Sequence, residues 1–400
     1  MPPHSDDDAQ GLRSAATSAP EPGSRNEELL LRARDSAAPL EEAEALLGEP
    51  VLPEGPRAHR SPRSRGLGIA VGLGLALAGG VLVLLGTSVL RKELVMAGRV
   101  GLSLLGVVVA YLGIARVVRA IWGPRTDVAY YMALVWIIVL VLAALLAPVL
   151  PIGEAENSSL TLTEPINARP ELWSDHPLGT NRLGLDLLAR VLYGARTSLV
   201  VALVATLIGM VLGGTFGLIS GYLRGWTDSL VGIVTNVLLA FPPLVLLLAL
   251  AAVLPRTARN QALTLSILVI PVNVRLARAS TLAFSQREFV LAAKAIGAKR
   301  RRIMVSELLP NVLVPLLSYA FIVLAVLIVA EASLSFLGLG IPQPAPTWGN
   351  MIAEGRNGVF EQYPHLVFVP ATALFLTVLS FNLVGERLRL RFTSGKQVEV

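Results

Sequence analysis

The residues with the most informative spacing form one basic segment, residues 286–311, between two apolar stretches. Its first part has apolar residues at helical spacing, and Gly297 is a suitable helix stop. Pro310 suits the first turn of the next helix, where its missing N–H costs nothing. Its small alanines would let another protein approach closely, so one interpretation is a contact site for a partner protein. The alternative is a helix that lies on the membrane surface and is held there by its basic charges. The predicted face consists of Phe289, Ala292 or Ala293, and Ile296.

Few residues are suited to catalysis or metal binding. The chain has no cysteine, which excludes disulfides, zinc–thiolate sites and thiol catalysis, and its four histidines are too widely spread to predict a metal site. The phosphate-binding pattern GxxxxGK[ST] does not occur, so any ATP chemistry must belong to another chain. Scattered carboxylates in the polar loops argue against a membrane-anchored enzyme.

Some polar and small residues lie within apolar stretches. Glu331 ends one stretch, and ionisable residues at such places are often functional, although a hydrogen bond to neighbouring backbone is the alternative. Glycines at every fourth position, Gly213, Gly217 and Gly221, predict the close approach of another helix, either of this chain or of another subunit.

The elements that must position these residues are membrane helices. The 400 residues are 54% hydrophobic and 16% charged, with a mean hydropathy of +0.64, whereas soluble proteins have about 25% charged residues. Since a bilayer-spanning helix needs about 20 apolar residues, the sequence predicts an all-α polytopic membrane protein. The predicted spans are 67–90, 100–121, 128–150, 198–222, 230–254, 262–282, 312–330 and 366–384.

Loop charges predict the orientation of the chain. The loop 151–195 has six acidic and three basic residues, whereas 275–302 has eight basic residues and one acidic residue. By the positive-inside rule both termini and 275–302 are cytoplasmic and the acidic loop is outside, although the short loops at 91–92 and 256–259 disagree. The basic residues lie beside apolar spans, which argues against a nucleic-acid partner.

The expected organisation has four parts. Residues 1–65 are polar, and we expect a disordered cytoplasmic tail. Residues 66–125 would form an extra transmembrane hairpin, which leaves the topology of the remainder unchanged. A transmembrane domain at 126–392 contains the cytoplasmic loop 284–311, and 393–400 is a carboxy-terminal tail.

The segment 286–311 resembles the EAA loop of ABC importer permeases. The pair Ala292-Ala293, then Gly297, and Leu309-Pro310 match that loop, whereas Leu291 stands where the family usually has Glu. The resemblance implies a coupling helix that sits in a cleft of an ATPase subunit. The implied coupling residues are Glu288, Phe289, Ala292, Ala293, Ile296, Gly297, Leu309 and Pro310.

Other motifs resemble the dipeptide, oligopeptide and nickel branch of these permeases, over about residues 128–391. They comprise 176–186, with Asn181 where Asp is common and Leu185 where Arg is common, 192–199, 239–243 and 331–352. The branch implies a six-helix MetI-like core. The implied external or pathway residues are His176, Asp186, Glu331, Trp348 and Asn350.

The resemblance implies a subunit of the bacterial cytoplasmic membrane that imports di- or oligopeptides, and nickel chelates or haem-like cargo are alternatives. Its partners would be a second homologous permease, two ATPase subunits or one fused or heterodimeric pair, an extracytoplasmic solute-binding protein and membrane lipid. The chain itself would hold no cofactor and would not be an enzyme, because ATP and Mg would bind to the ATPase partners. An ion-driven secondary transporter or channel is the alternative class, but it predicts charged or broken helices at the bilayer midplane.

Overall fold

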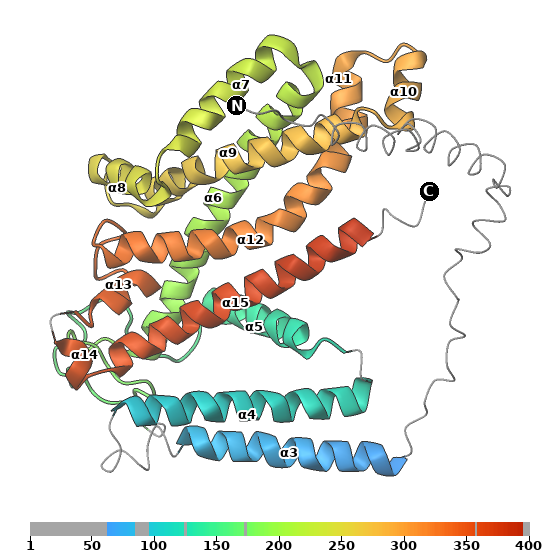
Figure 1. Ribbon diagram of the computed structural model, residues 1–400. Coiled ribbons are helices and arrows are strands. Elements are labelled where there is room, and N and C mark those ends of the chain that lie inside the picture. The colour runs from blue at the N-terminus through green and yellow to red at the C-terminus, as the bar shows by residue number, and fades with distance from the viewer. Residues whose placement is uncertain (1–61, 85–95, 124–125, 172–173, 357, 395–400) are drawn as a thin grey trace, which may run out of the picture. The chain divides into compact units, whose positions relative to one another are not determined.

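The computed structural model describes residues 62–84, 96–123, 126–171, 174–356 and 358–394 (Figure 1). The chain divides into two units, Met1–Gly68 and Ile69–Val400, and the description below concerns the second. The predicted tail 1–65 lies almost wholly outside the described residues, as does most of 393–400. Among the described residues the structure is helical, and its only β-type pairing is one isolated bridge between Thr180 and Asp186.

The element order follows the predicted sequence of apolar stretches and polar loops. The helices are α3 (Pro62–Leu84), α4 (Met96–Trp122), α5 (Val128–Leu146), α6 (Leu187–Leu223), α7 (Gly225–Ala240), α8 (Pro243–Val253), α9 (Ala258–Phe284), α10 (Glu288–Ala295), α11 (Arg300–Arg302), the π-helix η2 (Ile303–Leu308), α12 (Leu309–Phe336), α13 (Trp348–Ala353), α14 (Val359–Gln362) and α15 (His365–Ser394).

Six of the described helical segments are long and apolar enough to cross a membrane, which confirms the all-α polytopic class. They are Leu105–Trp122, Val128–Leu146, Leu187–Leu223, Ala258–Phe284, Arg300–Phe336 and His365–Leu390. The first predicted span is represented by a shorter apolar helix, Gly68–Val83, and the end of that span lies outside the described residues.

The predicted span at 230–254 is not one continuous helix. The segment forms two helices, α7 and α8, which are bent by 90° at a short break. Phe241 and Pro242 have extended backbone there. A proline has no N–H for the helical ladder and disfavours helical geometry in the residue before it, so the Phe-Pro-Pro sequence ends α7.

Two long helices begin well before the apolar stretches that predicted them. α6 has 37 residues and begins at Leu187, eleven positions before the predicted span, because Asp186 caps it there. Helical backbone leading into α12 begins at Arg300, where the sequence is basic. Apolar patterning locates the part of a helix within hydrocarbon and misses polar ends that continue beyond it.

The most extensive packing between two helices joins α6 and α9. A Cβ atom added at Gly213 would lie 2.6 Å from Asn273 Cβ, and one at Gly217 would lie 2.5 Å from Ala277 Cβ. At Gly221 the nearest atom, the Arg278 carbonyl oxygen, would be at 2.9 Å. The glycine repeat therefore packs against a helix of the same chain, which decides between the two interpretations of that repeat.

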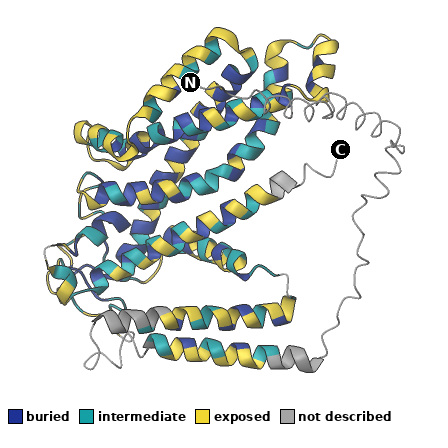
Figure 2. Ribbon diagram, viewed as in Figure 1, coloured by how far each residue is buried: buried dark blue, intermediate teal, exposed yellow. Residues whose placement is uncertain are grey.

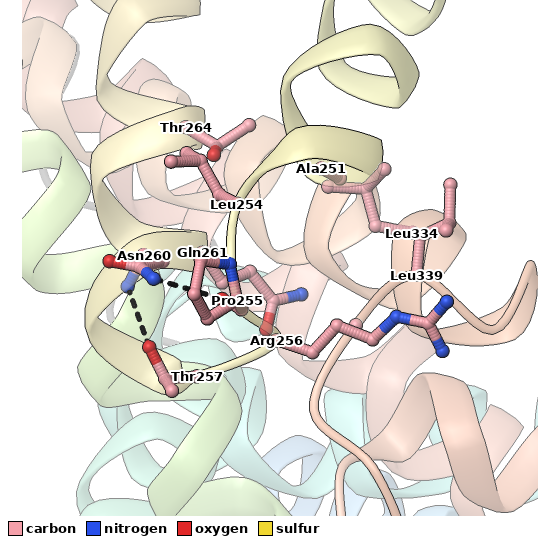
Figure 3. A pocket seen from close by; sticks show the side chains of 11 residues that line it. Ala251, Leu254, Pro255, Arg256, Thr257, Asn260, Gln261, Thr264, Leu334 and Leu339 are labelled. Atoms are coloured by element: carbon pink, nitrogen blue, oxygen red, sulfur yellow. Dashed lines mark hydrogen bonds between the residues drawn. The ribbon is translucent and has the colours of Figure 1, made fainter.

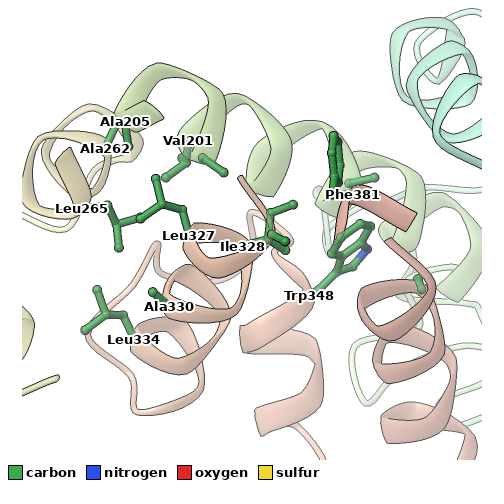
Figure 4. Close-up of a cluster of buried hydrophobic side chains, with 14 of the residues drawn as sticks. Val201, Ala205, Ala262, Leu265, Leu327, Ile328, Ala330, Leu334, Trp348 and Phe381 are labelled. Atoms are coloured by element: carbon green, nitrogen blue, oxygen red, sulfur yellow. The ribbon is translucent and has the colours of Figure 1, made fainter. Parts of the chain in front are cut away.

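The main core lies between α6, α9, α12, α13 and α15. Figure 4 shows Leu327 of α12 between Val201 of α6 and Leu265 of α9, with Ile328 nearer Trp348 and Phe381. Burial decreases away from this centre, and α3 and α4 carry many exposed apolar side chains (Figure 2). Such an exposed apolar surface is what lipid covers in a membrane protein.

Glycines also join α3 to α4. A Cβ atom at Gly79 would lie 2.3 Å from Ala110 N, and one at Gly113 would lie 2.3 Å from Ala76 N. At Gly72 and Gly106 the nearest atom of the opposite helix would be at 2.7 Å. The two helices thus pack backbone to backbone, as small residues at a membrane-helix interface allow.

Candidate functional site

Two groups of predicted site residues lie in different parts of the fold. The α10 region, residues 284–312, contains the predicted coupling residues, and the α13 region, residues 151–190 and 337–364, contains most of the others. Glu331 lies in α12, close to the α13 region.

The eight-residue helix α10 has one buried and one exposed side. Val290 and Ala293 are buried, whereas Phe289, Leu291 and Ile296 are exposed, Ile296 by 83%. Between the two residues that the spacing left open, Ala292 is exposed and Ala293 packs inward. The outer surface of α10 therefore presents apolar side chains beside the charged Glu288 and Lys294, and other described residues do not cover it.

Gly297 ends α10 through its backbone conformation. Its φ of +79° is left-handed, and the space beside it is open, so a glycine is favoured there by conformation and not by crowding. The N–H of Ala298 donates to the carbonyl of Ala293 at 3.0 Å, which closes the helix end in the manner of a Schellman motif.

The buried side of α10 is continuous with the membrane helices. Val290 and Ala293 share one apolar cluster with Ile303 of η2, Val312 of α12 and Leu218 of α6. Because this cluster is closely packed, a displacement of α10 would be transmitted to α6 and α12.

The second helix of the α10 region begins earlier than predicted. Pro310 does lie in the first turn of α12, but α11 and η2 already carry helical backbone from Arg300. A proline cannot donate to the preceding turn, and the wider π turn directly before it accommodates that loss. Asn311 Nδ2 donates to the Glu307 carbonyl at 2.7 Å, which satisfies one carbonyl of this turn.

In the α13 region, His176 bridges two carboxylates. Its Nδ1 lies 2.9 Å from Asp186 Oδ2, and its Nε2 lies 3.1 Å from Glu164 Oε2. Asp186 also caps α6, because its Oδ1 accepts from Ala189 N at 2.7 Å. Partial burial lowers the pKa of His176, but the hydrogen bonds with Glu164 and Asp186 outweigh it, so the pKa lies above its ordinary value.

A buried ion pair joins the start of α6 to the end of α13. Arg190 Nη2 donates to Glu354 Oε1 at 2.8 Å, and both side chains are almost wholly excluded from solvent. Asn181 Nδ2 donates to the other carboxylate oxygen at 3.2 Å, and Arg190 Nη1 donates to the Ala155 carbonyl at 3.1 Å. These bonds connect three segments that are distant in the sequence.

Trp348 and Asn350 hold the proline-containing loop 338–347 in place. Trp348 is fully buried and its Nε1 donates to the Val191 carbonyl at 3.1 Å. Asn350 forms a capping box with Thr347, and its Nδ2 donates to the Ala345 carbonyl at 2.8 Å. Both side chains thus have structural partners within the α13 region.

Glu331 is fully buried where α6, α9 and α12 meet. Its carboxylate accepts from Ser198 Oγ at 2.8 Å, from Ser335 Oγ at 2.7 Å and from Gln261 Nε2 at 3.4 Å. The partners are side chains of three helices, and not only neighbouring backbone as the alternative interpretation expected. Glu331 therefore ties three helices together at one level.

The recess beside Gln261 is too small for a solute. It lies between the end of α8, the start of α9 and α12, and Figure 3 shows Asn260 bonded to Thr257 at its edge. Its volume is about 10 Å³, which holds at most a water molecule.

Among the described residues, no group of three histidine or carboxylate side chains could hold a metal ion.

Sequence reasoning did not single out Arg190, Glu354, Ser198 or Gln261 as functional. Arg190 lies just before the predicted span and looks like an ordinary flanking cation, and Glu354 lies in a polar loop. A buried Arg beside an apolar stretch needs an acidic partner, which is a usable signal, but the sequence alone does not identify Glu354 as that partner.

Comparisons with known proteins agree with the fold. A family model described as a binding-protein-dependent transport system inner membrane component matches residues 213–395. The dipeptide transport system permease protein DppC of Alkalihalophilus pseudofirmus is 36% identical over 249 residues, which cover 62% of this chain and 80% of the relative.

Two further relatives are glutathione transport system permease proteins GsiD. The protein of Pectobacterium atrosepticum is 38% identical over 216 residues, covering 54% of this chain and 71% of the relative. That of Escherichia coli O6:K15:H31 is 37% identical over 257 residues, covering 64% and 83%. With the helical bundle and these matches, the chain belongs to the binding-protein-dependent inner-membrane permeases of ABC importers, of the DppC/OppC type.

Proposed function

We propose that this chain imports short peptides as one of two homologous permease subunits, between which the translocation pathway forms. Two ATPase subunits, or one fused or heterodimeric pair, bind ATP and Mg on the cytoplasmic side, and a solute-binding protein delivers the peptide from outside. Both chain termini and the α10 region are cytoplasmic, and the α13 region is external. The loop charges support this orientation.

The observation that carries the proposal is the two-sided character of α10. Its outer residues Phe289, Leu291 and Ile296 are exposed and apolar, whereas its inner residues Val290 and Ala293 pack on the cluster that reaches α6 and α12. An apolar surface on the water-exposed side of a membrane protein is suited to a protein partner. Contact at α10 would therefore couple an ATPase to the membrane helices.

The remaining predicted coupling residues have supporting roles in this proposal. Glu288 lies in the first turn of α10, Gly297 sets its end, and Leu309 and Pro310 follow the π turn. Leu291, which replaces the usual Glu of the family, would contact the ATPase through apolar surface instead of a carboxylate.

Peptide cargo is proposed from the relatives, whose names specify dipeptide and glutathione transport. Both kinds of solute are short, with peptide groups and free carboxylates. Nickel chelates and haem-like cargo are the competing candidates, and transport assays with purified solute-binding protein and each solute distinguish them.

Coupling through α10 is tested by the substitution Gly297→Val. A β-branched residue at φ +79° costs on the order of 1–3 kcal/mol, which would reshape the end of α10 without touching the membrane helices. We expect transport to fall by about tenfold or more while basal ATP hydrolysis and membrane insertion persist. Transport and ATPase rates are measured together in reconstituted vesicles.

Gly123→Val is a matched control, because Gly123 also has a positive φ, +107°, and open space beside it. It lies in the connection between α4 and α5, neither of which contributes to the apolar cluster under α10, and should preserve coupling. Normal coupling in Gly297→Val, or equal loss in both variants, would contradict the role of α10.

A further inference from the structure

The α13 region contains a cavity to which the proposed function assigns no role. It has a volume of about 650 Å³ and lies between the loop 338–343, α13, α14 and the start of α15, with Asn167 and Arg182 on one side. Small-molecule sites usually have about 300–1,000 Å³. The cavity is therefore large enough for a solute of dipeptide size.

The cavity has an excess of positive charge. Its charged lining residues are Arg182, Arg356 and Glu354. The carboxylate of Glu354 is already paired with the buried Arg190 at 2.8 Å. The two exposed arginines are thus left as the uncompensated charges, and a cavity of this kind attracts an anion.

Both arginines are held in place but keep donors for a ligand. Arg182 Nη2 donates to Gln343 Oε1 at 2.9 Å, and Arg356 lies over the Phe336 ring at 4.1 Å while donating to the Phe336 carbonyl. A guanidinium has five N–H donors, and its forked geometry matches a carboxylate. Each arginine can therefore bind a carboxylate without losing its present support.

The rest of the lining suits a peptide more than a simple anion. This lining combines side-chain amides and hydroxyls with apolar groups, which suits the peptide groups and side chains of a short peptide. The uncharged polar members are Asn167, Ser335, Gln343, Asn350, Gln362 and Tyr363, and the apolar ones include Phe336, Ile341, Pro342, Val359 and Leu366.

We propose that this cavity is an external binding site for a short peptide with a free terminal carboxylate, which Arg182 and Arg356 hold. The inference rests on the proposed function, because it places the cavity on the side where the solute-binding protein releases its cargo. It adds a chemical requirement, the free carboxylate, that the permease itself would impose.

The test uses the assembled importer in lipid nanodiscs without the solute-binding protein. Binding of alanyl-phenylalanine and of its carboxy-terminal amide is measured by calorimetry for the unmodified protein and for Arg182→Gln and Arg356→Gln. Arg169→Gln is the matched control, because Arg169 is an exposed arginine of the same loop outside the cavity lining. Thermal unfolding of each variant checks its folding.

We expect the free acid to bind at least about tenfold more tightly than the amide, as loss of a charge-assisted hydrogen bond implies. Each cavity variant should weaken binding of the acid by a similar factor, and Arg169→Gln should not. Equal binding of acid and amide, no detectable binding, or unchanged affinity in both cavity variants would overturn the site.

Two further measurements, association of the solute-binding protein and peptide-stimulated ATP hydrolysis, distinguish a peptide site from a docking surface and from failure of the proposed function. If the variants weaken association of the solute-binding protein but not direct peptide binding, the arginines serve docking and the peptide site is wrong. If direct binding fails while peptide-stimulated ATP hydrolysis still depends on this chain, the proposed function stands without the site.

Discussion

His176 uses both ring nitrogens on carboxylates, one of which, Asp186, also caps the longest described helix. The motif that contains it was readable from the sequence, but the third member, Glu164, was not, because it lies twelve residues earlier in an irregular loop. Spacing in a loop does not determine which side chains meet, whereas spacing in a helix does.

The raised pKa of His176 gives the loop a pH dependence with a definite sign. Stabilisation by the charged imidazole should be complete below the unfolded pKa of about 6.5 and lost as pH rises through the higher folded value. The effect should be less than about 1 kcal/mol, as for partly exposed ion pairs. Hydrogen exchange of the amides in 164–186 should therefore become faster, relative to its intrinsic rate, across that range.

His176→Gln should remove this pH dependence while leaving exchange in α9 unchanged. Protection that increases with pH, or the same pH profile in the variant, would show that His176 does not carry the effect.

The structure also gives a physical reason for Asn181, which stands where Asp is common in the related permeases. The Asn181 side-chain amide donates a hydrogen bond to Glu354, which an ionised Asp at that position could not do.

Helices α6 and α9 depend on one another through small residues. We expect Gly217→Val to destabilise the protein by about 1–3 kcal/mol, because even its Cβ would lie 2.5 Å from Ala277 Cβ and 2.6 Å from the Val274 carbonyl. Backbone atoms on the opposite helix cannot move aside without separating the pair. Thermal unfolding of the purified complex in detergent measures the loss.

Gly232→Val is the matched control for that substitution. Gly232 lies in α7 with open space beside it, and valine has a higher helix propensity than glycine, so its effect should be near zero. Equal melting temperatures for the two variants would show that the α6–α9 contact is not as close as described.

At the level of elements, much of the arrangement was predictable. Apolar length located the membrane helices, and the Phe-Pro-Pro sequence at 241–243 contains a sufficient signal for the break between α7 and α8. The partner of the glycine repeat was not predictable, because a small-residue face fits a helix of the same chain as well as one of another subunit. Only the folded chain decides between them.

For the whole molecule, the hairpin 66–125 is the part that we propose is dispensable. Its two helices pack on one another through glycines, and α4 is followed by a short connection to α5. We expect its deletion to leave the complex of the two permeases and their ATPase partners assembled and active in ATP hydrolysis, with at most reduced thermal stability. Co-purification of the partner subunits and ATPase rates measure this outcome.

The deletion removes two predicted spans, an even number, so we expect the remaining helices to keep their orientation. Protease protection of the carboxy terminus serves as the control for insertion. Loss of the partner subunits from a correctly inserted protein would show that the hairpin is part of the assembly interface.

The length of α6 has a mechanical consequence. With 37 residues it is about 55 Å long, well beyond the roughly 30 Å of hydrocarbon. Its first turns are fastened by Asp186 and Arg190, and Leu218 near its other end lies in the α10 cluster. It therefore connects the α13 region to the α10 cluster, and a tilt of about 10° about one end would move the other end by about 10 Å.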